Sequence, residues 1–260
     1  MEKKKNIFVR FFGGIWKAIK YTIMGIIIGV LYIFSYPFFR SKIKGKEKVR
    51  KDDEARVFIT NHYEMFGPIT CVLSLPWKFR PWIIDKMIDE KTVEEQMGLL
   101  LYSQYKKVPK WIKKVIIKCV KSIMVFTMKL FRGISVSRDN VRANIKTMQI
   151  SSETLEKKKA ILIFPEKFYV KQGVGPFMKG FEHIGKYHYQ KTGKKITFYP
   201  MFTSFKNKTI YIGDPITYNP EIDNNIQKEQ IINHLKNEMI DSYFEEEVIP
   251  EFYKKTRKRK

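Results

Sequence analysis

Short apolar runs bounded by polar residues recur along the chain from Arg56 onward, and amphipathic stretches separate them. The runs have the length and the β-branched and aromatic content of buried strands; they are Val57–Ile59, Pro81–Ile84, Ile134–Val136, Ala160–Phe164, Ile196–Met201 and Thr209–Ile212. Helices are predicted at Pro68–Leu75, from Glu90 to about Tyr102, from an Asp139-Asn140 cap to about Gln149, from Met178 to about Lys191 and at Ile226–Val248. Strands that alternate with helices predict an α/β domain.

The amino-terminal region has a different pattern. Most apolar residues between the lysines and arginines of residues 2–20 share one helical face, and Tyr21–Phe39 contains no charge. This stretch is at the lower end of the length that spans a bilayer, where about 20 residues are needed. It predicts a retained anchor, either a spanning helix or a shallow hairpin-like pair of helices, with a buried core helix as the alternative. The charged segment Arg40–Glu54 is interpreted as a linker.

These patterns predict three parts: a membrane-associating helical element at 1–45, an α/β domain at 46–250 and a basic tail at 251–260. The chain has 50 Lys and Arg against 26 Asp and Glu, a net charge of +24. So large an excess indicates an anionic partner, either nucleic acid or a membrane surface. The uncharged Tyr21–Phe39 stretch favours the membrane.

A second basic region lies inside the domain. Gln96–Ser137 has no acidic residue, and several of its lysines follow helical spacing on one side: Lys110, Lys114, Lys118 and Lys121. A basic amphipathic helix is typical of a membrane-surface element. An ordinary amphipathic helix packed on the sheet is the other interpretation. Cys71 and Cys119 both stand in apolar surroundings and are predicted to be buried thiols of a reducing compartment. No metal site is predicted, because no Cys/His cluster has ligand spacing.

Chemically useful side chains stand where predicted strands end. His62 follows one strand, Arg138 another and Glu166 a third. In an open α/β sheet, ligands collect beyond the carboxyl ends of the strands. A base, a cation and a carboxylate gathered there suit a polar, anionic acceptor beside a lipid phase. Taken singly, His62 is also typical of a hydrogen-bonded structural histidine, Arg138 of a surface ion pair and Glu166 of a turn.

The order of the strand-end residues is more specific. The sequence resembles the glycerolipid acyltransferase family, which contains the 1-acylglycerol-3-phosphate acyltransferases. The matching elements are Asn61-His62 of the motif Asn-His-x4-Asp, Gly133 to Arg138 of Gly-x-Ile-x-Ile-x-Arg, Phe164-Pro165-Glu166 of Phe-Pro-Glu-Gly-Thr-Arg, Pro176-Phe177 with Gly180 of Pro-Phe-Lys-x-Gly, and Tyr199-Pro200-Met201 of a Val-Pro-Val strand. The resemblance covers about residues 56–215. It implies a central mixed sheet flanked by helices.

The resemblance also implies an activity and a set of roles. A membrane-bound enzyme of phospholipid biosynthesis would move a fatty acyl group from acyl-CoA or acyl carrier protein to the hydroxyl of a lysophospholipid or a related lipid. It would need no cofactor, would bind anionic membrane lipids but no nucleic acid, and would have its catalytic domain facing the cytoplasm. The implied general base is His62, Arg138 would bind the acceptor phosphate, Glu166 would orient the acceptor or the loop, and Asn61 would also contribute to substrate binding.

The sequence departs from the family pattern at two places. The aspartate of the first motif falls at Gly67, so Glu64 is the predicted carboxylate partner of His62. The Gly-Thr-Arg of the third motif is replaced by Lys167-Phe168-Tyr169. The lysines expected to compensate as point charges are Lys167, Lys171 and Lys179. A non-catalytic relative that binds lipid is the alternative function, and a nucleic-acid-binding protein is a third interpretation, from charge alone.

Overall fold

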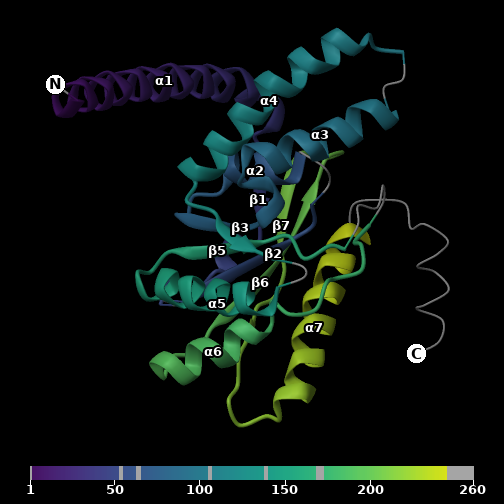
Figure 1. The fold of residues 1–260 in the computed structure, drawn as a ribbon. Helices are drawn as coiled ribbons and strands as arrows, with labels where there is room; N and C mark the ends of the chain where they lie inside the picture. The colour runs from purple at the N-terminus through teal and green to yellow at the C-terminus, as the bar shows by residue number, and fades with distance from the viewer. Residues whose placement is uncertain are drawn as a thin grey trace. The chain divides into compact units, whose positions relative to one another are not determined.

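The computed structural model describes residues 2–52, 55–62, 66–104, 107–137, 140–167 and 173–244. The chain divides into two compact units. One contains the chain up to Phe38 together with Lys86–Leu130, and the other contains Phe39–Asp85 and the chain from Phe131 onward. The second unit contains the sheet, and the first is helical (Figure 1).

The described residues of the second unit form one eight-stranded sheet. Its strands are β1 (Lys42–Lys44), β2 (Arg56–Thr60), β3 (Phe79–Ile84), β4 (Ile134–Val136), β5 (Ala160–Ile163), β6 (Thr197–Ser204), β7 (Thr209–Ile212) and β8 (Ile216–Thr217). The order is β1-β7-β6-β2-β5-β3-β4, and β8 pairs with β6. Strands β2 to β6 are mutually parallel, whereas β7 and β8 run antiparallel to β6. The predicted mixed sheet is therefore confirmed.

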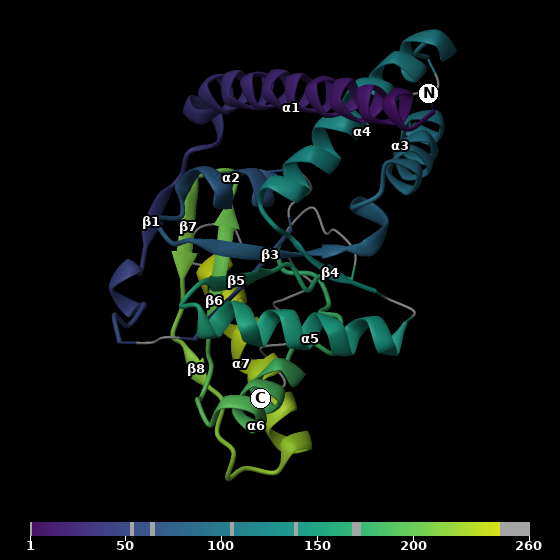
Figure 2. The same cartoon turned by 60° about the vertical axis from the view of Figure 1, so that its left-hand side comes forward.

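Both faces of the sheet are covered by helices. Side chains alternate between the two faces along each strand, so each strand contributes to two cores. On one face, Val57 and Ile59 of β2 lie in the larger core, to which α5 (Val141–Glu156), α6 (His183–Thr192) and α7 (Asn224–Phe244) contribute. On the other face, Phe58 packs in a second core with Cys71 of α2 (Phe66–Ser74). Figure 2 shows α5 and α2 on opposite sides of the strands. Because these strands are buried on both faces, their sequences are short continuous apolar runs, and the prediction that such runs form buried strands is confirmed.

Three details differ from the sequence-based expectation. The predicted linker Arg40–Glu54 contains β1, which pairs with β7, and a 3₁₀ turn at Lys46–Lys48. The short β8 was also not predicted. Helix α6 begins at His183 and not at Met178, because the Met178 amide donates to the Pro165 carbonyl at 2.7 Å and Gly180 has a φ of 122°.

The first unit contains α1 (Glu2–Phe39), α3 (Glu90–Gln104) and α4 (Lys110–Leu130). Asp89 caps α3, since its carboxylate accepts from the amides of Lys91 and Thr92 at 3.0 and 3.2 Å. Helix α1 is one continuous helix, so the hairpin alternative is wrong. Its Tyr21–Phe39 stretch is long and apolar enough to cross a bilayer and has no buried residue, which argues against a buried core helix.

The two cysteines have different surroundings. Cys71 is fully buried, and burial raises the pKa of its thiol to about 12. Cys119 on α4 is exposed, so the prediction of a buried thiol was wrong for this residue. The apolar neighbours of Cys119 in sequence lie partly on the exposed side of an amphipathic helix, which sequence alone could not assign.

A buried histidine makes the stability of the second unit depend on pH. Ser152 Oγ lies 2.8 Å from His188 Nδ1, and the ring is 1% exposed. Burial lowers the pKa of His188, so the unfolded chain binds a proton on this ring at a higher pH than the folded chain does. We expect the free energy of unfolding to fall as pH drops below about 6.5, by at most about 1.4 kcal/mol per pH unit from this group. Denaturant unfolding of the parent and of His188→Gln at several pH values measures this slope; an equal slope in both proteins would contradict the assignment.

Candidate active site

The end of β2 is held by an asparagine. Asn61 Nδ2 donates to the Thr203 carbonyl at 3.1 Å, and the Thr203 amide donates back to Asn61 Oδ1 at 2.7 Å. Pairing of β2 with β6 ends at Thr60 and Met201, so this side chain continues the ladder beyond the last backbone pair. Asn61 is 1% exposed. Its amide group is therefore engaged with β6 and fixes the backbone that carries His62.

Glu166 fixes the same backbone from the neighbouring strand. Its Oε2 accepts from the His62 amide at 2.8 Å, and its Oε1 accepts from the Gly175 amide at 2.7 Å. Glu166 is 8% exposed. Burial raises the pKa of the Glu166 carboxyl, and the two amide hydrogen bonds act in the opposite direction. A carboxylate offers a separate acceptor oxygen to each of the two amides, which a glutamine side chain does not.

The segment after β5 returns antiparallel to itself around Glu166. Glu166 pairs with Phe177 in an isolated bridge, the Lys167 amide donates to the Pro176 carbonyl at 2.8 Å, and the Met178 amide donates to the Pro165 carbonyl. The Gly175 amide thus belongs to a loop whose ends are fixed. The His62 turn and this loop share one carboxylate.

The His62 ring lies at the edge of the sheet, in contact with an aromatic ring. It is exposed, and its centroid lies 5.2 Å from that of Phe164 in an edge-to-face arrangement. Phe164 is in turn part of the wall of a pocket of about 830 Å³. His62 therefore stands one side chain away from this pocket.

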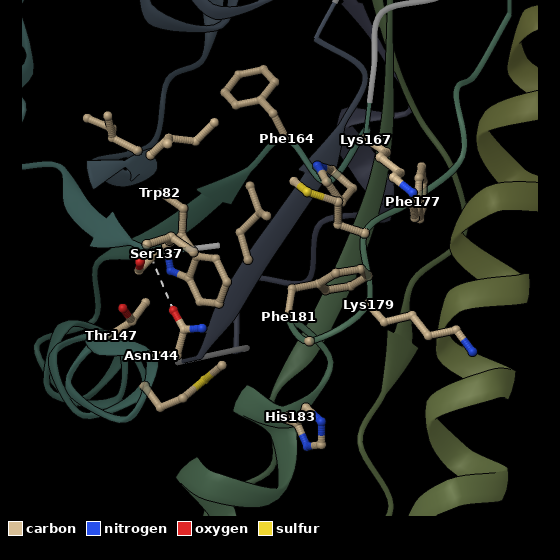
Figure 3. A pocket seen from close by; sticks show the side chains of 18 of the residues that line it. Trp82, Ser137, Asn144, Thr147, Phe164, Lys167, Phe177, Lys179, Phe181 and His183 are labelled. Atoms are coloured by element: carbon tan, nitrogen blue, oxygen red, sulfur yellow. Dashed lines mark hydrogen bonds between the residues drawn. The ribbon is translucent and has the colours of Figure 1, made fainter. Parts of the chain in front are cut away.

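The pocket opens beyond the carboxyl ends of β3, β4 and β5, where an α/β sheet is expected to bind ligands. Its wall is mostly apolar, with Trp82, Phe177 and Phe181 as large members (Figure 3). Trp82 is fixed by a 3.0 Å hydrogen bond from its Nε1 to Ser151 Oγ. Asn144 Oδ1 accepts from the Ser137 amide at 3.2 Å, which closes one side. A pocket of this size and composition suits an apolar chain with a polar end group.

A glycine stands next to the His62 turn, at the second residue of α2. A Cβ at Gly67 would lie 2.3 Å from the His62 carbonyl oxygen and 2.9 Å from that of Asn61. No side chain fits at those distances. The position that the family motif gives to an aspartate is thus closed to any residue larger than glycine in this conformation.

The other predicted site residues are placed unevenly. Lys167 is exposed and lines the pocket. Lys179 also lines it, but its ammonium group pairs with Glu229 of α7 at 3.1 Å. The remaining three lie outside the described residues: Glu64, Arg138 and Lys171. The structure thus brings together Asn61, His62 and Glu166.

Several contributors escaped the sequence interpretation. Thr203 takes part through its backbone amide and carbonyl, which leave no side-chain signature in the sequence. Trp82 lay within a predicted strand and Phe181 within a predicted helix, with no role assigned to either, and the pairing of β3 with β5 brings Trp82 near the site. Among the residues that the structure describes, no group of three or more His, Cys, Asp or Glu could hold a metal ion.

No protein-family model matches this sequence, and no curated protein matches it. Among solved structures, the chain is similar to the 1-acyl-sn-glycerophosphate (LPA) acyltransferase PlsC from Thermotoga maritima. The two share 13% sequence identity and a TM-score of 0.49, over 96% of this chain and 100% of that chain. The likeness concerns the course of the chain, and the chemistry of the site follows from its own residues.

The close approach at Gly67 has a measurable consequence. We expect Gly67→Ala to lower the free energy of unfolding by about 1–3 kcal/mol, because the new methyl group must displace the backbone of His62. Gly98→Ala is the matched control, since a Cβ there finds no atom within 4 Å in helix α3. Alanine should leave stability unchanged or raise it by up to about 1 kcal/mol at that position. Equal effects of the two substitutions in denaturant unfolding would refute the close approach.

The shared carboxylate can be tested directly. Glu166→Gln keeps the shape but turns an NH₂ group toward one of the two backbone amides, so one hydrogen bond is lost. We expect faster hydrogen exchange at the His62 or Gly175 amide, measured on peptides that contain them. Glu221→Gln, at an exposed position, is the control and should leave both amides unchanged. Unaltered exchange in Glu166→Gln would show that the carboxylate does not hold the two segments.

Proposed function

We propose that this chain is a membrane-associated acyltransferase of the glycerolipid type. It transfers a fatty acyl group from the thioester of acyl-CoA or acyl carrier protein to the hydroxyl of a lysophospholipid or a related lipid. The observation that carries the proposal is the position of His62, held through its backbone by Glu166 and placed against Phe164 at the wall of the apolar pocket. The ordered strand-end motifs of the sequence support the same function.

The proposed reaction needs one base and no covalent enzyme intermediate. His62 takes the proton of the acceptor hydroxyl as the oxygen attacks the thioester carbonyl carbon, and the imidazolium returns the proton to the thiolate that leaves. The products are the new ester and the free thiol. Binding both substrates at one site removes much of the entropic cost of bringing them together. The pocket beside Phe164 offers a place for the acyl chain.

Glu166 acts in this proposal as a positioning residue. Its carboxylate contacts the backbone amide of His62 and holds the turn that carries the imidazole. The predicted carboxylate partner of the ring itself is Glu64. Gly67 cannot take that role, because it has no side chain and no space for one.

The positive groups near the pocket complete the proposal. Lys167 is exposed beside the pocket and is offered as a contact for an anionic headgroup, whether on the acceptor or on the donor. Lys179 serves the same end only if its pair with Glu229 exchanges for the ligand. Arg138 and Lys171 remain predicted phosphate contacts.

Replacement of the base tests the function. We expect His62→Ala to lower the rate of acyl transfer by about 10²–10⁴-fold, the usual contribution of a general base. The assay uses purified full-length protein in lipid, long-chain acyl-CoA or acylated carrier protein, and a panel of lysophospholipids, with the acylated product detected by mass spectrometry. The control is His234→Ala, a histidine outside the pocket lining whose Nε2 lies 2.7 Å from the Asp214 carbonyl oxygen, and it should retain activity within a fewfold. A His62→Ala protein as fast as the parent would end the proposal.

One observation favours a second candidate, a non-catalytic lipid-binding relative. The motif aspartate is absent, and the backbone around Gly67 leaves no room to restore it. This candidate requires that the parent protein bind a lysophospholipid or an acyl thioester yet form no product with any donor of the panel. The same assay with an added binding measurement separates the two functions.

A further inference from the structure

Helix α4 of the first unit has one exposed face of unusual composition. Its exposed residues recur at helical spacing through the first half of the helix: Trp111, Lys114, Val115, Lys118 and Cys119. Trp111 is 68% exposed and Val115 is 55% exposed. We name these five residues the α4 outer face. A face that joins a tryptophan and an aliphatic residue to lysines is typical of a helix lying in a bilayer interface.

The opposite face of α4 is occupied within the unit itself. Ile117 and Val125 are buried, and Lys113 is buried with its ammonium group 4.9 Å from the centroid of the Tyr102 ring of α3. Lys121 pairs with Glu94 of α3 at 2.5 Å. Lys113 and Lys121 therefore have partners on α3. We call α3 and α4 together the α3–α4 hairpin, and contacts within it account for these two lysines.

The outward lysines have a different environment. Within the described part of the chain, no ion pair joins a carboxylate to Lys110, Lys114 or Lys118. No acidic residue stands between Gln96 and Ser137, whereas Glu90, Glu94 and Glu95 gather at the start of α3. The pairs Lys113–Tyr102 and Lys121–Glu94 show that the helices are antiparallel, so the acidic start of α3 lies beside the second half of α4. The first half of α4 is therefore the basic end of the hairpin.

We propose that the α4 outer face docks on the surface of an anionic phospholipid bilayer, as a membrane contact additional to the uncharged stretch of α1. The lysines match anionic headgroups, each contributing an attraction that salt screens, and Trp111 and Val115 enter the headgroup boundary. The exposed Leu99 and Tyr102 at the end of α3 add apolar surface at the same end of the hairpin. The proposal concerns binding alone and stands whether or not the chain transfers acyl groups.

The bilayer is favoured over another partner by the unit to which α4 belongs. Tyr21 of α1 contacts Phe126 of α4, with ring centroids 5.6 Å apart, and both helices belong to the first unit. The Tyr21–Phe39 stretch of α1 is uncharged and has no buried residue. A basic, apolar face on a helix that belongs to the same unit as this stretch is complementary to the headgroups of the membrane that α1 would enter.

The chain has a natural probe for this face. Cys119 is exposed, and the second cysteine of the sequence, Cys71, is fully buried. A thiol-reactive, environment-sensitive fluorophore therefore labels Cys119 in the parent protein. The labelled full-length protein is placed in nanodiscs of phosphatidylcholine alone or of phosphatidylcholine with phosphatidylglycerol. We expect a blue shift, quenching by lipid-attached nitroxide and shielding from aqueous iodide in the phosphatidylglycerol discs, all weakened by salt.

Two controls make the test specific. The triple variant Lys110→Gln, Lys114→Gln, Lys118→Gln should weaken docking on the order of 100-fold, since each lysine near an anionic surface is worth about fivefold in binding. The matched variant Lys186→Gln, Lys195→Gln, Lys206→Gln removes the same charge from exposed positions of the second unit and should dock like the parent. A label at Gln230→Cys in a Cys119→Ser background reports on a surface that should stay accessible to iodide.

The outcomes separate the possibilities. Shielding that is equal in both kinds of disc, or equal for the two triple variants, overturns the recognition of anionic lipid. Shielding that appears without lipid and rises with protein concentration assigns the face to a second copy of the chain and overturns the proposal. A Cys119 label as accessible to iodide as the Gln230→Cys label shows a solvated face and also overturns it.

Discussion

The candidate site depends on one buried carboxylate that two backbone amides share. Glu166 joins the backbone at His62 to the loop at Gly175, by hydrogen bonds of 2.8 and 2.7 Å. Burial of a charge is costly unless it is hydrogen-bonded, and bonds to a charged group contribute about 1.5–3 kcal/mol each. The carboxylate is therefore stable in this place only while both segments keep their positions. The backbone at His62 is held on one side by Glu166, which follows β5, and on the other by Asn61, which is hydrogen-bonded to Thr203 of β6.

Such a hold on the backbone leaves the imidazole itself outside the core. The ring contacts Phe164 at the pocket wall and remains exposed to solvent. A side chain at a boundary of this kind can contact an apolar ligand group on one side and a polar group on the other. The close approach of α2 at Gly67 fixes the same turn from a third direction, at the expense of any acidic side chain there. Residue 67 therefore cannot supply a carboxylate to the imidazole in this conformation.

The strands could be predicted because the sheet is buried on both faces and its strands read as apolar runs bounded by polar residues. Strand β1 could not, since Lys42–Lys44 has a charged pattern and gains its place only by pairing with β7. The meeting of His62 with Glu166 followed from the rule that parallel strands end at one edge. The sequence could not predict that Glu166 contacts the backbone amides of His62 and Gly175, because hydrogen bonds to backbone amides do not depend on side-chain type. Exposure of Cys119 likewise depends on which side of α4 packs against α3.

In the sequence, α3 and α4 lie within the connection between β3 and β4. Adjacent parallel strands need a crossover of about a dozen residues, which one helix supplies. Here the connection runs from Asp85 to Gly133 and carries two helices, of which α4 alone has 21 residues. The parallel pairing of β3 with β4 does not require a second helix in this connection. Its composition, basic and aromatic on one face and free of acidic residues, is therefore not explained by the topology of the sheet. Because the hairpin lies within a connection, its surface can be adapted to a partner while the strands that carry His62 and Glu166 keep their register.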